Sequence, residues 1–167
     1  MSRSFHLSFD MPASVEQVHA AYSDENYWLA RLAAFGGSKT LESLQVSDDG
    51  AVRVVVTEDL RHGKLPGILT RIYRGDLNIV STEEWTPSSD GRVNGQITVA
   101  VIGAPGSGHG TALLAPFGNG SRLTTDATVE FKVPLVGGTI ESFLAREFAQ
   151  GLPKIERFTT TWISEYA

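Results

Sequence analysis

The chain has 167 residues, of which 41% are hydrophobic and 20% charged, and its formal net charge is -5. These values are ordinary for a globular protein, and the length suits one domain spanning residues 1–167. An acidic chain without a basic run argues against nucleic acid as a partner, and no segment approaches the ~20 apolar residues of a stable membrane insertion. The absence of cysteine excludes disulfides and thiolate catalysis and fits a cytoplasmic location.

The first third of the chain predicts one strand followed by two helices. Apolar and polar residues alternate from Phe5 to Met11, as in a strand with one buried face. Ser14 followed by Gln17 is a capping-box pattern that starts a short helix. A second helix is predicted from near Asp24 to the Gly36-Gly37 pair. Its apolar side chains are Trp28, Leu29, Leu32 and Phe35.

The middle of the chain predicts six strands. Their expected spans are 40–46, 51–59, 77–85, 93–102, 111–117 and 123–133. Turn residues at Asp48-Asp49-Gly50 and Gly118-Asn119-Gly120 favour tight hairpins between neighbouring strands. Residues 60–67 are predicted to form a loop.

The glycine-rich segment 103–110, Gly-Ala-Pro-Gly-Ser-Gly-His-Gly, is predicted to be a flexible connection between two strands. A phosphate-binding loop would instead lead into a helix and carry a Lys-Ser or Lys-Thr pair. Neither feature is present, so nucleotide binding is not predicted.

The last element is predicted to be an amphipathic helix of roughly 27 residues, about 40 Å long. Its apolar stripe is Ile140, Leu144, Phe148, Leu152, Ile155, Phe158, Trp162 and Tyr166. Pro153 lies inside it and removes one backbone hydrogen bond, which favours a bend. A helix of this length in a small domain must lie across a sheet.

This order of elements resembles the helix-grip fold of the START, polyketide-cyclase and pollen-allergen superfamily. The segment SFHLSFDMPASVEQVHAAYSDENYW resembles its opening strand and helix pair, and GNGSRLTTDATVEFKVPLVGGTIE resembles its last hairpin and the start of the grip helix. The segment STEEWTPSSDGRVNGQITVAV is similar to an uncharacterised actinobacterial branch. The resemblance implies an α+β helix-grip fold, in which a curved antiparallel sheet of about seven strands surrounds a long C-terminal helix.

The same resemblance implies a mostly apolar cavity between the sheet and the C-terminal helix, and an apolar small-molecule ligand as the partner. The residues expected to bind it are Trp28, Leu32, Ile79, Glu83, Trp85, Val99, Phe131, Leu144, Phe148 and Leu152. Core packing alone would also explain the aromatic residues among them. Members of the superfamily include carriers, enzymes and receptors, so the resemblance specifies the fold and not the activity.

Two ionisable residues are candidates for chemistry. Glu83 shares a strand face with Ile79 and Trp85, where burial would raise its pKa and suit it to proton transfer or to binding a ligand hydroxyl. The alternatives are that the strand bulges near its end, or that Glu83 pairs with an arginine at the rim. His62 lies with Arg61 and Lys64 in the predicted loop, which the resemblance puts near the pocket mouth.

The four histidines are far apart in the sequence, and His19 is predicted to face solvent. No metal and no cofactor are expected, and no catalytic residue is assigned because no nucleophile motif is present.

Three functions remain open at this point. The first is binding of a lipid, fatty acid or polyketide-like molecule in the cavity. The second is a cyclase, aromatase or hydrolase-like enzyme that uses a pocket carboxylate or histidine. The third is a protein-interaction module whose cavity is filled by side chains. The missing catalytic motif ranks binding ahead of catalysis, and the sequence does not set the oligomeric state.

Overall fold

Seven strands form a single antiparallel sheet in the order β1-β7-β6-β5-β4-β3-β2 in the computed structural model, which describes residues 2–35, 38–60 and 67–166. The strands are β1 (Ser2–Met11), β2 (Ser38–Val46), β3 (Val52–Asp59), β4 (Asn78–Pro87), β5 (Val93–Ile102), β6 (Gly106–Phe117) and β7 (Gly120–Phe131). The helices are α1 (Val15–Tyr22), α2 (Glu25–Ala34), α3 (Gly67–Ile72) and α4 (Gly137–Tyr166). The predicted helix-grip fold is confirmed.

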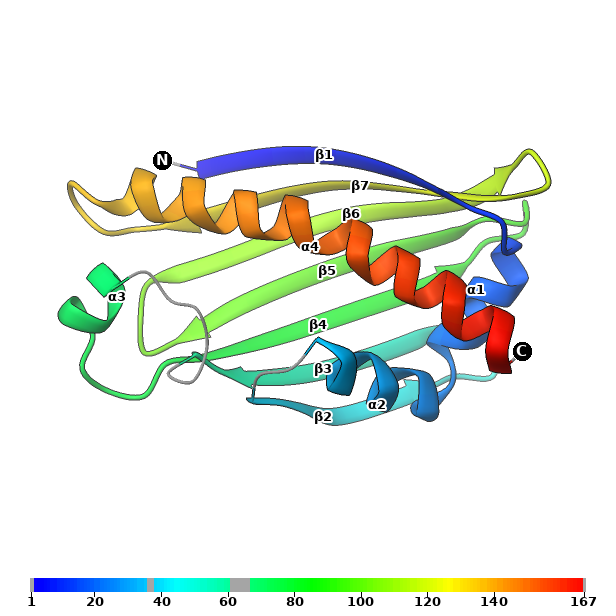
Figure 1. Cartoon of the computed structure of the whole chain (residues 1–167), viewed down its shortest axis with the longest axis horizontal. Helices are drawn as coiled ribbons and strands as arrows, with labels where there is room; N and C mark the ends of the chain where they lie inside the picture. The colour runs from blue at the N-terminus through cyan, green and yellow to red at the C-terminus, as the bar shows by residue number, and fades with distance from the viewer. Residues whose placement is uncertain (1, 36–37, 61–66, 167) are drawn as a thin grey trace.

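The first strand pairs with the last one, although more than a hundred residues separate them. Phe5 lies opposite Ala127 in the antiparallel register of β1 and β7. This pairing places the first strand beside the longest hairpin, β6 and β7, and so joins the first and last strands of the chain in one sheet. Helix α4 then crosses the face of the sheet from β1 and β7 toward α1 and α2 (Figure 1).

Helices α1 and α2 connect β1 to β2, with α1 at one end of the sheet and α2 packed beside β2 (Figure 1). The capping box is complete, since Ser14 Oγ accepts from Gln17 N at 3.1 Å and Gln17 Oε1 accepts from Ser14 N at 2.9 Å. Asp24 caps α2 by accepting from Asn26 N at 2.8 Å. The sequence therefore specified both helix starts through short-range hydrogen bonds.

The apolar side chains of α2 do not all face the sheet. Leu29 is 50% exposed, whereas Tyr27 and Trp28 are fully buried. With Asp24 as the cap, Trp28 and Leu32 lie one turn apart on the face toward the sheet, and Leu29 turns away from it. Gly36 and Gly37, predicted as the stop, lie outside the described residues.

Buried aromatic rings pack where α1, α2, the sheet and the C-terminal half of α4 meet. The ring centroids of Tyr22 and Trp85 are 4.8 Å apart, and those of Tyr27 and Trp162 are 5.4 Å apart in an edge-to-face arrangement. Trp28 Nε1 donates to the carbonyl oxygen of Tyr22 at 2.7 Å, so this buried polar atom is satisfied. This end of the molecule is a densely packed core.

The start of α4 is tied to the end of β7. Glu141 is fully buried, and its Oε2 accepts from Phe131 N at 2.9 Å. The helix runs for 30 residues, three more than predicted, and Pro153 lies inside it. Tyr166, at the end of the predicted apolar stripe, is exposed.

The structure differs from the predicted loop at 60–67 at the end of that segment. Residues 67–72 form α3, which the sequence did not indicate. Residues 61–66, with Arg61, His62 and Lys64, lie outside the described residues.

The glycine-rich segment is the main correction to the predicted strands. Strand β6 begins at Gly106, five residues before its predicted start, and Gly106, Gly108 and Gly110 belong to the strand rather than to a flexible connection. The turn before it needs only Gly103, whose φ is +97°. Glycine has low strand propensity, which is why the sequence predicted a loop; pairing with β5 and β7 on both sides overrides that preference.

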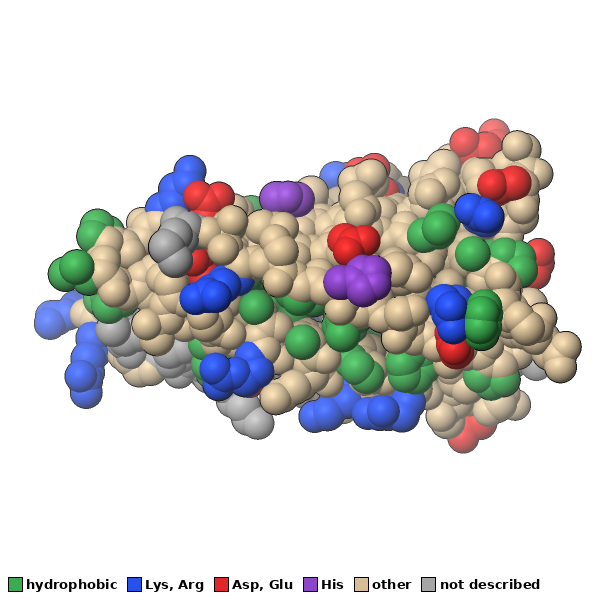
Figure 2. All heavy atoms as spheres, turned by 90° about the horizontal axis from the view of Figure 1, so that it is seen from above, with side chains coloured by type: hydrophobic (Ala, Val, Ile, Leu, Met, Phe, Trp, Pro, Cys, Tyr) green, Lys and Arg blue, Asp and Glu red, His purple; other side chains and the backbone are tan. Residues whose placement is uncertain are grey.

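Acidic and basic side chains both occur across the face seen from the β1 side (Figure 2). Within the described residues no helix combines the length and apolar character needed to cross a membrane.

Candidate functional site

A cavity of about 290 Å³ lies between the sheet and α4. Its walls come from all the strands and from helices α1, α2 and α4, and most of its lining side chains are apolar. All ten residues predicted to bind a ligand line this cavity: Trp28, Leu32, Ile79, Glu83, Trp85, Val99, Phe131, Leu144, Phe148 and Leu152. Their position is therefore as the sequence predicted, and their role in binding stays a prediction.

Glycines of β5 and β6 explain why the sheet and helix leave space between them. A Cβ at Gly95 would lie 2.6 Å from the Trp85 ring, and one at Gly106 would lie 2.6 Å from the Phe131 ring. Two aromatic side chains therefore lie against glycines at opposite ends of the cavity floor. At Gly108, between them, a Cβ would make only ordinary contacts of 3.5–3.6 Å. The cavity extends down to the backbone of the sheet at Gly108, because glycine has no side chain to fill the space.

This role of the glycines was not predicted from the sequence. A signal was available, because Gly106, Gly108 and Gly110 recur at every second position, the period of one strand face, and Ala112 and Leu114 continue it. In a strand interior, glycine marks a close approach of another group.

The roof of the cavity is the middle of α4. Leu144, Phe148 and Leu152 line it and are only partly buried. The Phe148 ring stacks on Phe5 of β1 with centroids 6.4 Å apart. The helix thus contacts β1 on one side and leaves its apolar stripe facing the cavity.

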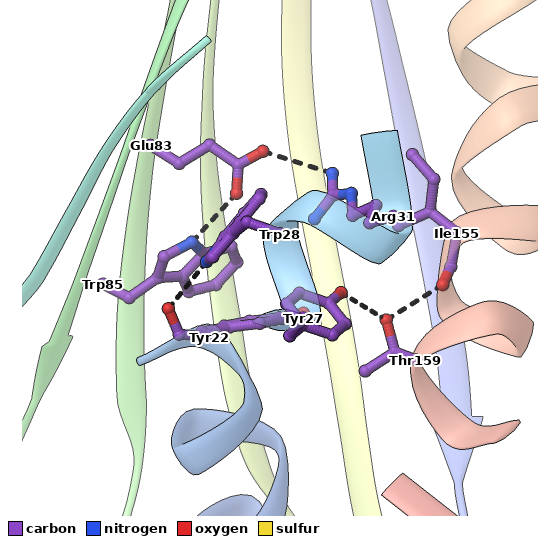
Figure 3. A network of polar contacts seen from close by, with 8 residues as sticks. All are labelled: Tyr22, Tyr27, Trp28, Arg31, Glu83, Trp85, Ile155 and Thr159. Carbon is purple, nitrogen blue, oxygen red and sulfur yellow. Dashed lines mark hydrogen bonds and ion pairs between the residues drawn. The ribbon is translucent and has the colours of Figure 1, made fainter. Parts of the chain in front are cut away.

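One end of the cavity is polar, and Figure 3 shows its hydrogen bonds. Arg31 Nη2 donates to Glu83 Oε1 at 3.3 Å, and Trp85 Nε1 donates to Glu83 Oε2 at 3.0 Å. The Arg31 guanidinium also lies 4.6 Å from the centre of the Trp28 ring. The side chains of Arg31 and Glu83 are 13% and 18% exposed. The predicted alternative, in which Glu83 pairs with an arginine, is what the structure shows.

Glu156 of α4 is a second carboxylate at this end, and it was not predicted from the sequence. It is 4% exposed and lines the cavity, and its buried Oε2 has no hydrogen-bond partner in the described part of the chain. Burial raises the pKa of Glu156 to about 7, although the attraction of Arg31 opposes the rise. The charge of Glu83 adds to the increase. A carboxyl group with this pKa gains and loses its proton near neutral pH.

The sequence offered a weak signal for Glu156. The residue adjoins Ile155, which belongs to the predicted apolar stripe, and it lies three positions before Thr159, another buried polar residue of α4. Neither residue was predicted to be buried, and a charged side chain such as that of Glu156 is usually exposed.

Two tyrosines complete the polar end. The Thr159 hydroxyl donates to the Ile155 carbonyl oxygen at 2.9 Å, so at 2.7 Å the Tyr27 hydroxyl must donate to Thr159 Oγ1 (Figure 3). Burial raises the pKa of Tyr27, and burial together with the negative charge of Glu156 raises the pKa of Tyr22 well above its usual value. Both tyrosines therefore stay neutral at physiological pH.

The described histidines lie apart from one another. His19, predicted to face solvent, is partly buried, and its Nε2 is 2.7 Å from the Gly50 carbonyl oxygen, which accepts the ring N–H. His6 is exposed and contacts Asp126. Among residues 2–35, 38–60 and 67–166, no three histidine, aspartate or glutamate side chains are placed to hold a metal ion.

The chain matches a known protein family. Residues 6–163 match the family described as "Protein of unknown function (DUF2505)". The chain belongs to this family. It is 38% identical over 171 residues to uncharacterized proteins of Mycobacterium tuberculosis and Mycobacterium bovis, with 98% of each chain covered. These relatives are actinobacterial, as the sequence resemblance indicated.

Solved structures share the fold at low sequence identity. A START superfamily protein from Mycobacterium smegmatis aligns with a TM-score of 0.56 and 13% identity, covering 98% of this chain and 99% of that one. Norcoclaurine synthase from Thalictrum flavum, solved with dopamine and hydroxybenzaldehyde, aligns with a TM-score of 0.57 and 14% identity. The alignment covers 100% of this chain and 89% of that one. A Thermus thermophilus protein aligns with a TM-score of 0.61 and 17% identity, covering 99% of both chains. The fold is START-like.

Proposed function

We propose that this protein binds a hydrophobic or amphipathic small molecule, such as a lipid, a fatty acid or a polyketide-like compound, in the cavity between the sheet and α4. The observation that carries the proposal is a cavity lined mostly by apolar side chains, in which the Arg31–Glu83 ion pair and the Glu156 carboxylate lie together at one end. Apolar burial would supply the affinity, and the polar end would orient the ligand.

The size of the cavity restricts the ligand. A volume of about 290 Å³ is near the low end of the range for small-molecule sites, which is roughly 300–1,000 Å³. At about 30 Å³ for a water-sized group, it has room for roughly ten heavy atoms. A medium-chain or one-ring ligand therefore fits better than a long diacyl lipid.

The test is a titration with single-chain probes. Binding is monitored through the fluorescence of Trp28 and Trp85, which line the cavity. Decanol should change the emission in a saturable way and raise the melting temperature through mass action. Gly108→Leu, which places a side chain on the cavity floor, should weaken binding, whereas Leu29→Ala, on the exposed side of α2, should not. Binding that is equal in both variants would reject the cavity as the site.

A second candidate function is proton-transfer catalysis, favoured by Glu156. A general acid or base works best when its pKa is near the operating pH, and Glu156 meets that condition beside the cavity. Under this function a compound that binds would also be converted, and Glu156→Gln would abolish turnover while leaving binding measurable. Recovery of every bound compound unchanged would favour the binding function alone.

A further inference from the structure

The Glu156 carboxylate is the one group at the polar end for which the described residues supply no partner. Its Oε2 is buried without a hydrogen bond, while Glu83 accepts from both Arg31 and Trp85. An unpaired buried carboxylate is costly, and in a cavity the missing partner can come from a ligand.

The charges of the cavity indicate what that partner is. Arg31 is the one cation at the polar end among the described residues, and its ion pair is with Glu83 at 3.3 Å. Two other lining charges, Lys39 and Glu58, lie opposite each other in the register of β2 and β3 and have opposite signs. When Glu156 is ionised, the cavity therefore carries one carboxylate more than it has cations.

The groups around Glu156 do not supply the missing charge. Tyr22 of α1 and Tyr27 of α2 are neutral, and Glu83 of β4 repels Glu156. Arg31 attracts it, yet the two do not form an ion pair within 4.0 Å. The surroundings are aromatic, and the faces of Trp and Tyr rings also attract cations.

We propose that the polar end of this cavity binds the ammonium group of an amphipathic amine, with the unpartnered carboxylate of Glu156 accepting its N–H and the Arg31–Glu83 pair staying intact. The proposal rests on the proposed function, because the hydrocarbon part of the amine occupies the apolar cavity. An alkanol would satisfy the hydrogen bond without balancing the charge. A fatty acid would place a third carboxylate beside Glu83 and Glu156.

The experiment compares decylamine, decanol and decanoate below their critical micelle concentrations, because they share one tail and differ only in the head group. Dissociation constants are measured by tryptophan fluorescence between pH 6 and pH 8. An alkylamine stays charged throughout this range, as lysine does. Since Glu156 ionises with a pKa of about 7, decylamine affinity should rise about tenfold from pH 6 to pH 8. Decanol affinity should be nearly constant, and decanoate affinity should not rise.

The variant Glu156→Gln keeps the shape and removes the charge. Loss of a hydrogen bond to a charged group corresponds to roughly a tenfold to hundredfold weaker binding of decylamine at pH 8, and the pH dependence should disappear. Glu147→Gln, the same substitution on the exposed side of α4, is the matched control and should match the wild type.

Three outcomes decide the matter. Stronger decylamine binding at high pH, lost in Glu156→Gln only, supports the amine site. Binding of decanol or decanoate without preference for decylamine overturns it and leaves the proposed function in place. Failure of all three probes to bind overturns both. The pH series on the wild type decides even if the variant does not fold.

Discussion

Helix α4 carries one apolar stripe, but its two halves have different surroundings. From Ile155 to Ile163 it packs against α1 and α2, where Trp162 meets Tyr27. From Leu144 to Leu152 it lies over the cavity, above strands whose inward residues include Gly108. The same periodicity thus serves a dense core in one half and the wall of a cavity in the other. The difference comes from what lies opposite: aromatic side chains in one case and a glycine floor in the other.

The largest effect is expected in the packed half. Trp162→Ala removes a buried ring that contacts both Tyr27 and Tyr166, so the free energy of unfolding should fall by roughly 3–5 kcal/mol. Urea denaturation measures this change. A loss below ~1 kcal/mol would show that this half is not a packed core.

The next effect concerns Glu156, at the boundary between the two halves. Its folded-state pKa of about 7 is above the ordinary glutamate value of 4.5, so the folded protein holds the proton more tightly. The stabilisation is complete below pH ~4.5 and is lost as pH rises to about 7, a change of about 3 kcal/mol. Glu156→Gln should remove this dependence and be more stable than the wild type at pH 8. Unfolding curves between pH 5 and pH 8 test it, with Glu147→Gln as control. An unchanged pH dependence in Glu156→Gln would contradict it.

A smaller effect is expected in the half above the cavity. Phe148→Ala should lower the free energy of unfolding by only roughly 1–2 kcal/mol, because its ring is partly buried and borders empty space. Decanol affinity should change at the same time. A loss as large as that of Trp162→Ala would remove the distinction between the two halves.

The smallest effect on the free energy of unfolding is expected at Gly108, where the sheet borders the cavity. Gly108→Ala should raise the free energy of unfolding by about 0.4–1 kcal/mol, since the new Cβ makes ordinary contacts and the unfolded chain loses freedom. Gly95→Ala is the matched comparison, and it should destabilise because its Cβ would clash with Trp85. Thermal unfolding of both variants measures the contrast. The same sign in both would mean that Gly108 does not border open space.

Most of the fold was predictable because it depends on local patterns. The capping box at Ser14, the turn at Asp48-Asp49-Gly50 and the stripe of α4 each act over a few residues. The start of β6 was not predictable from propensity, since β7 pairs with Gly106 and both β5 and β7 pair with Gly108. Glu83 was found from its place on an apolar strand face. Glu156 was not, because its burial depends on α1 and α2, which are distant in sequence.

The central claim is that the space between β6 and the middle of α4 receives an apolar ligand. The most direct measurement is a titration of isotope-labelled protein with decanol, in which amide NMR chemical shifts report binding. The account predicts saturable changes at Gly108, Gly110 and the helix around Phe148, with the amides at the Ser88–Gly91 turn unchanged. Shifts confined to the outer face of the sheet, or no saturable shifts, would contradict it.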